Sequence, residues 1–339
     1  MNKRIASLLQ YLFFLGLGIF LVWWSLGKIE ADQWEQMKDA LKGADYWPMV
    51  PVTLALLVSH FSRAVRWKIL MEPLGYKPSL TNTYLAVLIG YLANLLVPRL
   101  GEVLKCTLLA RYEKVPADKL IGTIVAERAF DLICLIIVFA ITIVSQIDII
   151  GEFAMDMLNK LFTGGTGEFN YNRLLIFAAI VLVIGTGSWY ALQKFSHIGF
   201  INKIRVIGKG IWEGLTSVRY VKNKGWFFFH TALIWFLYLA SIRLGFLALT
   251  ETSFYGWLPA FSVLSLGSVG MIVTQGGVGA YPILVQETMM LYGLNEIIAK
   301  AFGWILWLAQ FFLVIVAGGA AFFLFPLLNR KKKESPHMA

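Results

Sequence analysis

Residues 80–110 read LTNTYLAVLIGYLANLLVPRLGEVLKCTLLA, an apolar stretch that is interrupted by turn-forming residues. It holds two apolar runs, 80–97 and 103–110, and the second is too short to cross a bilayer, because a spanning helix needs about 20 mostly apolar residues. Between the runs, Pro98 lacks a backbone donor and Gly101 allows a tight turn, so a helix break is expected. The stretch therefore predicts a re-entrant hairpin, which enters the membrane and returns to the same side.

The whole composition agrees with a membrane protein. Of 339 residues, 58% are hydrophobic and 15% are charged, and the mean hydropathy is +0.69. This is more apolar surface than one soluble core can bury. The net charge of +10 comes from basic residues that bunch beside apolar segments, which indicates membrane loops and argues against nucleic-acid binding. The two cysteines, Cys106 and Cys134, lie in or beside apolar segments, so neither a disulfide framework nor a metal cluster is expected.

Six segments are long and apolar enough to span without strain. A second split stretch, 255–293, breaks at a glycine cluster and predicts a second re-entrant hairpin. We therefore expect an all-α polytopic membrane protein with about six spanning helices plus two re-entrant hairpins. The expected spans lie near 7–27, 46–67, 120–145, 172–193, 226–249 and 303–328.

Loop charges predict the topology, because lysine and arginine in short loops mark the cytoplasmic side. Lys3 and Arg4 place the N-terminus inside, and the basic run 330–333 places the C-terminus inside. The acidic loops 28–45 and 146–171 are then external, provided that the first hairpin keeps loop 105–119 cytoplasmic. Such a chain consists of two inverted-topology halves in a bacterial-type inner (plasma) membrane. The expected parts are one membrane domain over 1–339, with inverted halves 1–150 and 170–330 and a basic cytoplasmic tail 331–339.

Charges at membrane depth mark candidate sites, because they normally face a cavity or a partner. Arg63 and Arg66 share one helical stripe, and guanidinium groups match phosphate oxygens, so they predict a groove for a lipid phosphate. The alternative is that they reach out to the cytoplasmic headgroups. Arg243 lies 17 residues after Trp226, as Arg63 lies 17 residues after Tyr46. We therefore expect both arginines near the axis that relates the halves.

The turn of the first hairpin carries Asn94, Arg99 and Glu102 around Gly101. A helix that starts near Gly101 offers free N–H groups and a positive dipole end, which favour an anion. Glu102 can instead fill that position as an ordinary acidic residue of the first helical turn. The sequence leaves both interpretations open.

Residues 127–131 read Glu-Arg-Ala-Phe-Asp. Glu127 and Asp131 are four apart on one face, and Arg128 can pair with Asp131 three residues on. The cluster is either a self-neutralised structural feature, or a proton- or cation-linked site, or the partner of the arginines in the second span.

The turn of the second hairpin contains Gln275, Gly277 and Gly279, and Glu287 follows. Neither a dinucleotide-binding nor a P-loop glycine pattern is present. The four histidines are scattered without metal-ligand spacing, so the sequence predicts no metal, no cofactor and no catalytic residue.

At these motifs the chain resembles the transmembrane, flippase-like region of lysylphosphatidylglycerol synthases, over roughly residues 5 to 328. In that family, two-domain members make an aminoacylated lipid in a soluble C-terminal domain and translocate it through the membrane domain. The printed chain ends at Ala339, so the resemblance implies flipping without synthesis. The motifs are Ser62-Arg63-x-x-Arg66-Trp67, Asn94-x-x-x-Pro98-Arg99-x-Gly101-Glu102, Glu127-Arg128-x-x-Asp131 and Gly276-Gly277-Val-Gly279 with Glu287.

The leading hypothesis is a flippase-like lipid transporter that is not an enzyme and that translocates or binds an anionic phospholipid or a polyprenyl-phosphate-linked lipid. The alternative is an integral-membrane enzyme acting on a lipid-linked phosphate or sugar. Membrane lipids are the expected partners, with a second copy of the chain or a lipid-modifying enzyme as the protein partner. The predicted binding residues are Arg63, Arg66, Asn94, Arg99, Glu102, Glu127, Arg128, Asp131, Arg243, Gln275, Gly277 and Glu287.

Overall fold

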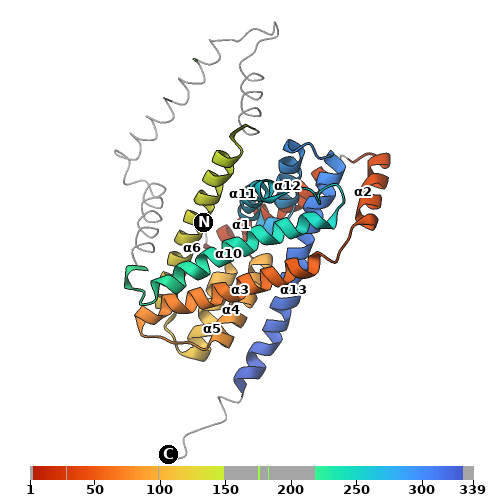
Figure 1. Cartoon of the computed structure of the whole chain (residues 1–339). Coiled ribbons are helices and arrows are strands. Elements are labelled where there is room, and N and C mark those ends of the chain that lie inside the picture. Colours follow the sequence, from red (N-terminus) through yellow and green to blue (C-terminus); the bar gives the residue numbers. More distant parts are fainter. Residues whose placement is uncertain are drawn as a thin grey trace, which may run out of the picture.

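The computed structural model describes residues 3–27, 29–97, 99–148 and 218–330, together with Leu175 and Leu182, and this part is all-α, as predicted (Figure 1). Apart from Leu175 and Leu182, the expected span 172–193 lies outside the described residues, as does the tail 331–339. The α-helices are α1 (Lys3–Gly27), α2 (Ala31–Gly43), α3 (Met49–Met71), α4 (Leu80–Leu96), α5 (Leu100–Glu113), α6 (Ala117–Ser145), α10 (Lys224–Gly245), α11 (Trp257–Val273), α12 (Ala280–Leu291) and α13 (Glu296–Arg330). Short 3-10 turns are η1 (Glu72–Leu74), η2 (Val218–Tyr220), η3 (Phe246–Ala248) and η4 (Gln275–Gly277).

Three helical segments of the described chain are long and apolar enough to cross a membrane: α6, α10 with η3, and α13. Shorter apolar helices are α4, α11 and the end of α1. Only 17% of the most apolar window of α6 and 22% of that of α13 is buried inside the protein. Exposed apolar surface on this scale is unfavourable in water and favourable against lipid.

Helix α3 was also expected to span, but its composition is less apolar because it carries Arg63, Arg66 and Lys68. The two arginines do not face lipid. They are 6% and 0% exposed, and they donate hydrogen bonds to Tyr238 and Thr231 of α10, the helix that packs along α3 (Figure 1). A count of charges along this helix therefore underestimates how apolar its outer face is.

The acidic stretch 28–45, expected as a loop, instead forms the amphipathic helix α2. Its buried residue Met37 packs with Ile297 and Ala301 near the start of α13. A helix can pack against the protein through one apolar face while its other face carries charged residues.

Helices α4 and α5 form a tightly packed antiparallel pair around the expected break. Arg99 adopts a left-handed conformation with φ of 63° just before α5 begins. The Asn94 side chain accepts a hydrogen bond from the Gly101 N–H at 2.8 Å. A Cβ on Gly101 would lie 2.0 Å from the carbonyl oxygen of Gly90, so glycine permits the close approach of the two backbones.

The outer ends of this pair are joined as well. Glu113, the last residue of α5, accepts hydrogen bonds from Ser79 and Asn82 at the start of α4. Asn82 also bonds with Asn329 near the end of α13, at 2.9 Å. The pair therefore begins and ends at the same side of the bundle, where α13 also ends.

Helices α11 and α12 repeat this arrangement. Gly276, Gly277 and Gly279 all have positive φ between them, which glycine adopts without a steric penalty. At the outer end, the Tyr255 hydroxyl donates to the backbone oxygen of Tyr292 at 3.0 Å. The inner turns of the two pairs touch, because Gln275 Nε2 donates to the backbone oxygen of Leu95 at 2.9 Å.

Charge divides between the two ends of the bundle. One end of the bundle is formed by the end of α3, the start of α4, the α5–α6 link and the end of α13. This end carries mostly basic residues: Lys68, Lys77, Arg111, Lys114, Lys119 and Arg330, with Glu72, Glu113 and Asp118. At the other end the N–H of Asp45 bonds to the oxygen of Ala248 at 2.8 Å, which joins the α2–α3 link to η3. That end carries mostly acidic residues: Glu30, Asp32, Glu35, Asp39, Asp45, Glu251 and Glu296, with Lys38, Lys42 and Lys300.

Two apolar clusters form most of the core. The first, called the α3–α5 cluster, contains Trp67, Leu88 and Leu109 with Phe325 of α13. The second, called the α10–α12 cluster, contains Phe246 and Tyr281 with a different part of α13. Its α13 members are Ala299, Phe302, Ile305, Leu306 and Trp307.

We expect Gly101→Ala to lower the stability of the folded chain, because the added Cβ would overlap the backbone oxygen of Gly90. Overpacking of this kind costs about 1–3 kcal/mol. Gly122→Ala in α6 is the matched control, since a Cβ there meets nothing within 4 Å. Thermal unfolding of both variants in detergent tests this. Equal melting temperatures would show that α4 and α5 are farther apart than described.

Candidate functional site

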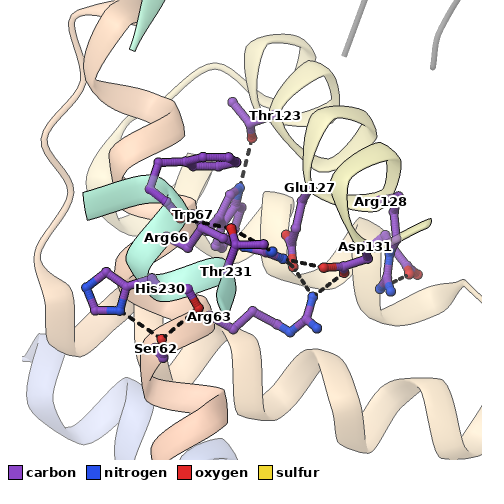
Figure 2. Close-up of polar contacts among 12 residues, drawn as sticks. Ser62, Arg63, Arg66, Trp67, Thr123, Glu127, Arg128, Asp131, His230 and Thr231 are labelled. Atoms are coloured by element: carbon purple, nitrogen blue, oxygen red, sulfur yellow. Dashed lines mark hydrogen bonds and ion pairs between the residues drawn. The ribbon is translucent and has the colours of Figure 1, made fainter. Parts of the chain in front are cut away.

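Five charged residues, four of them buried and Asp131 partly exposed, meet between α3, α5 and α6, and we call them the charged cluster: Arg63, Arg66, Lys105, Glu127 and Asp131. Figure 2 shows Arg63, Arg66, Glu127 and Asp131 of this cluster. Arg63 Nη1 lies 2.7 Å from Glu127 and 2.6 Å from Asp131. Arg66 Nη2 lies 2.7 Å from Asp131. Lys105 Nζ lies 2.9 Å from the second oxygen of Glu127. The carboxylates of α6 are thus the partners of the arginines in α3, one of the interpretations that the sequence left open.

The charged cluster is nearly closed to solvent. Its least buried side chain, Asp131, is 15% exposed, and Glu127 is fully buried. Three cations face two carboxylates, which leaves one formal positive charge in excess. Buried ions have little water to stabilise them, so each depends on its partners, and removing one partner leaves an uncompensated charge.

Neighbouring side chains hold the cluster in place. The Trp67 indole N–H donates to Thr123 at 2.8 Å, and Lys105 Nζ lies 4.6 Å above the Trp67 ring. The Tyr238 hydroxyl accepts from Arg63 Nη2 at 3.3 Å and ties the cluster to α10. The guanidinium groups therefore have fixed directions.

A cavity of about 490 Å³ opens beside the cluster, between α3, α4, α6, α10, α11 and α13. Arg63, Arg128 and Asp131 line one part of it. Most of the remaining wall is apolar, with residues such as Leu135, Val263, Leu264, Ile272, Phe311 and Val314. Both inner turns also reach it, through Asn94, Leu95 and Gly276.

Four predicted residues, Arg63, Asn94, Arg128 and Asp131, therefore line one cavity. Arg66 and Glu127 lie directly behind them in the charged cluster. Glu102 binds Arg128 at 2.8 Å. Arg128 thus pairs across to α5 rather than with Asp131 on its own helix.

The other predicted residues are more scattered. Gln275 joins the two inner turns, and Gly277 lies in η4. Arg99 and Glu287 are exposed. Arg243 is half-buried, does not line the cavity and makes no hydrogen bond or ion pair with any described residue, although its neighbour Ile242 does line the cavity.

Sequence reasoning missed Lys105 and His60. Lys105 lies within the apolar run of the first hairpin, so the rule for intramembrane charges would have identified it. His60 lines the cavity and stacks on Tyr91, with ring centroids 4.4 Å apart. No sequence signal pairs these two rings, because they come from different helices. Among the described residues, no group of three or more His, Cys, Asp or Glu could hold a metal ion.

Comparison with known proteins identifies the family. The family model for the lysylphosphatidylglycerol synthase TM region matches residues 8–318. A UPF0104 membrane protein of Methanocaldococcus jannaschii is 24% identical over 293 residues, which is 83% of this chain and 85% of that protein. No solved structure matches the chain. Because the family model covers most of the chain, this protein is an integral multi-pass membrane protein that belongs to the family of the lysylphosphatidylglycerol synthase transmembrane region.

Proposed function

We propose that the protein binds an anionic lipid in the central cavity and translocates it across the membrane. The candidate lipids are phospholipids and polyprenyl-phosphate-linked lipids, and the headgroup would lie beside Arg63 and Arg128. One observation carries the proposal: the cavity is charged at one part of its wall and apolar over most of the rest. An amphiphile with an anionic headgroup is divided in the same way, into a charged end and an apolar remainder.

The size and position of the cavity support this proposal. A volume of about 490 Å³ is within the range of small-ligand pockets, about 300–1,000 Å³. The net positive charge of the cluster beside it favours an anion. The apolar part of the wall suits the carbons next to a headgroup.

The paired inner turns support transport rather than binding alone. Each helix pair begins and ends on one side, and the inner turns meet at the cavity. We propose that the pairs enter the membrane from opposite faces as parts of two inverted halves. Such a construction lets one central site open to either side by motion of the halves.

Transport is tested with the full chain in liposomes that contain a headgroup-labelled anionic phospholipid. A membrane-impermeant reductant bleaches only the outer leaflet, so transport increases the fraction of label that is bleached. We expect faster loss of label than in protein-free liposomes. Equal rates with and without protein would contradict the proposal.

The same liposomes test the enzymatic alternative. Mass spectrometry of the extracted lipid after incubation would reveal a new product if the protein acted on a lipid-linked phosphate or sugar. The contacts favour transport, because both oxygens of Glu127 and both of Asp131 are engaged by cations. A carboxylate held in this way is a poor proton donor or acceptor.

The proposed orientation places the basic end of the bundle and both termini in the cytoplasm. In a chain with Cys106 and Cys134 replaced by alanine, we expect Glu251→Cys to react with an impermeant thiol reagent added to intact cells. Lys114→Cys should react only after permeabilisation. Both positions lie outside the apolar segments, so each should be accessible from its own side. Labelling of Lys114→Cys in intact cells would contradict the proposed topology.

A further inference from the structure

Arg128 differs from the other cations around Glu127. Its side chain is 50% exposed, whereas those of Arg63, Arg66 and Lys105 are at most 7% exposed. It lines the large cavity and also an adjoining small pocket of about 20 Å³ between α3, α4, α5 and α6. Arg128 therefore stands between the cavity and the inner turn of the first helix pair.

The guanidinium of Arg128 has unused bonding capacity. Arginine carries five N–H donors in a fork that fits phosphate oxygens. Within the described residues, the hydrogen bond from Nη2 to Glu102 at 2.8 Å accounts for all of its side-chain bonding. Arg63 and Arg66, by contrast, are each held by Asp131, and Arg63 is also held by Glu127.

Glu102 is an incompletely satisfied partner for Arg128. Its second oxygen, Oε2, is buried and has no hydrogen-bond partner within the described chain. A buried acceptor without a partner is unfavourable. Both oxygens of Glu127 and both of Asp131 are engaged by cations, whereas Glu102 has one buried oxygen left unpaired within the described chain. An anion that presents more oxygens can compete with Glu102 for the guanidinium.

We propose that Glu102 occupies the anion-binding position of Arg128 in the empty protein, and that the phosphate group of an amphiphile in the cavity displaces it. This inference rests on the proposed function and identifies which cation receives the headgroup. Glu102 lies in the first turn of α5, directly after the Gly101 contact with α4. Its release detaches that turn from α6 and so connects occupation of the cavity to the first helix pair.

The proposal predicts opposite effects for the two partners. Glu102→Gln removes the internal competitor. The apparent affinity for the phospholipid should then rise by the inverse of the fraction of wild-type molecules in which Arg128 is free of Glu102. If that fraction is roughly one tenth, the rise is about tenfold. Arg128→Gln removes the charged donor and should weaken binding by about tenfold or more. Arg128→Lys keeps the charge without the fork and should lie between wild type and Arg128→Gln.

The experiment uses the full chain in a neutral maltoside detergent, with intrinsic tryptophan fluorescence as the readout, because Trp235 and Trp307 line the cavity. The probes are dihexanoylphosphatidylglycerol, dihexanoylglycerol and inorganic phosphate. Glu35→Gln is the control, because it makes the same change in an exposed pair with Lys38 on α2. Melting temperatures are recorded for every variant.

Tighter binding of the phospholipid to Glu102→Gln, weaker binding to Arg128→Gln and no change in the control would support the inference. Weaker binding to both variants would overturn it, since the pair would then be a structural tie. If wild type prefers the phospholipid over dihexanoylglycerol but neither variant differs, the inference fails and the proposed function stands. If no variant prefers the phospholipid, both fail. The same pattern with inorganic phosphate would assign the position to free phosphate rather than to a lipid. If Arg128→Gln does not fold, the other two variants decide the question: Glu102→Gln should bind the phospholipid more tightly than wild type, and Arg128→Lys should bind it more weakly.

Discussion

Glu127→Ala is expected to lower the free energy of unfolding by about 3–5 kcal/mol, which makes it the most destabilising single change in the site. Glu127 is fully buried and binds Arg63 and Lys105 through its two oxygens, with Arg66 at 3.7 Å. Removal leaves Asp131 to balance three buried cations. The apparent melting temperature in detergent should fall by on the order of 10 °C.

Arg243→Ala is the matched control for this prediction. Arg243 was expected to correspond to Arg63, but it is half-buried and unbonded within the described chain. Its removal should change stability by no more than about 0.5 kcal/mol, whereas Arg63→Ala should approach the effect of Glu127→Ala. A small effect at Glu127 together with a large one at Arg243 would show that the charged cluster does not stabilise the bundle.

Ser268→Trp should reduce lipid translocation to the rate of protein-free liposomes. Ser268 lines the cavity on α11. Among the residues that the structure describes, its hydroxyl bonds only to the backbone oxygen of Leu264 in its own helix, at 2.6 Å. The indole would occupy space that is empty in the folded protein, so the melting temperature should stay within a few degrees of wild type. The headgroup-labelled liposome assay measures the loss.

Ser145→Trp makes the same change at an exposed position at the end of α6. It should leave translocation unchanged. Undiminished transport in Ser268→Trp would place the pathway outside the cavity. Loss of transport in both variants would show that the effect is not specific to the cavity.

The first helix break could be predicted from sequence because it depends on local chemistry. The described helices end at Leu96 and resume at Leu100, on either side of the break that Pro98 and Gly101 indicate. Helix α2 was missed for the opposite reason. Its charged residues resemble a loop, and what fixes it is the contact of Met37 with α13, far away in sequence.

The charged residues could be identified from sequence, but their partners could not. Spacing along α6 allowed Arg128 to pair with Asp131, yet the packing of α5 brings Glu102 closer to it. Lys105 was overlooked because one charge in an apolar run barely changes its average hydropathy. Which charges meet depends on how helices cross, and a single sequence does not encode that crossing in any local pattern.

Helix α13 makes the folding of the two apolar clusters interdependent. Its 35 residues extend about 52 Å without interruption. The early part, around Phe302, completes the α10–α12 cluster, and Ala321 and Phe325 complete the α3–α5 cluster. Unfolding of either cluster therefore also disrupts the part of α13 that completes it. Because α13 is shared by both clusters, the bundle is one cooperative unit. The family match ends at residue 318, and a chain cut there would keep the first set of contacts and lose the second.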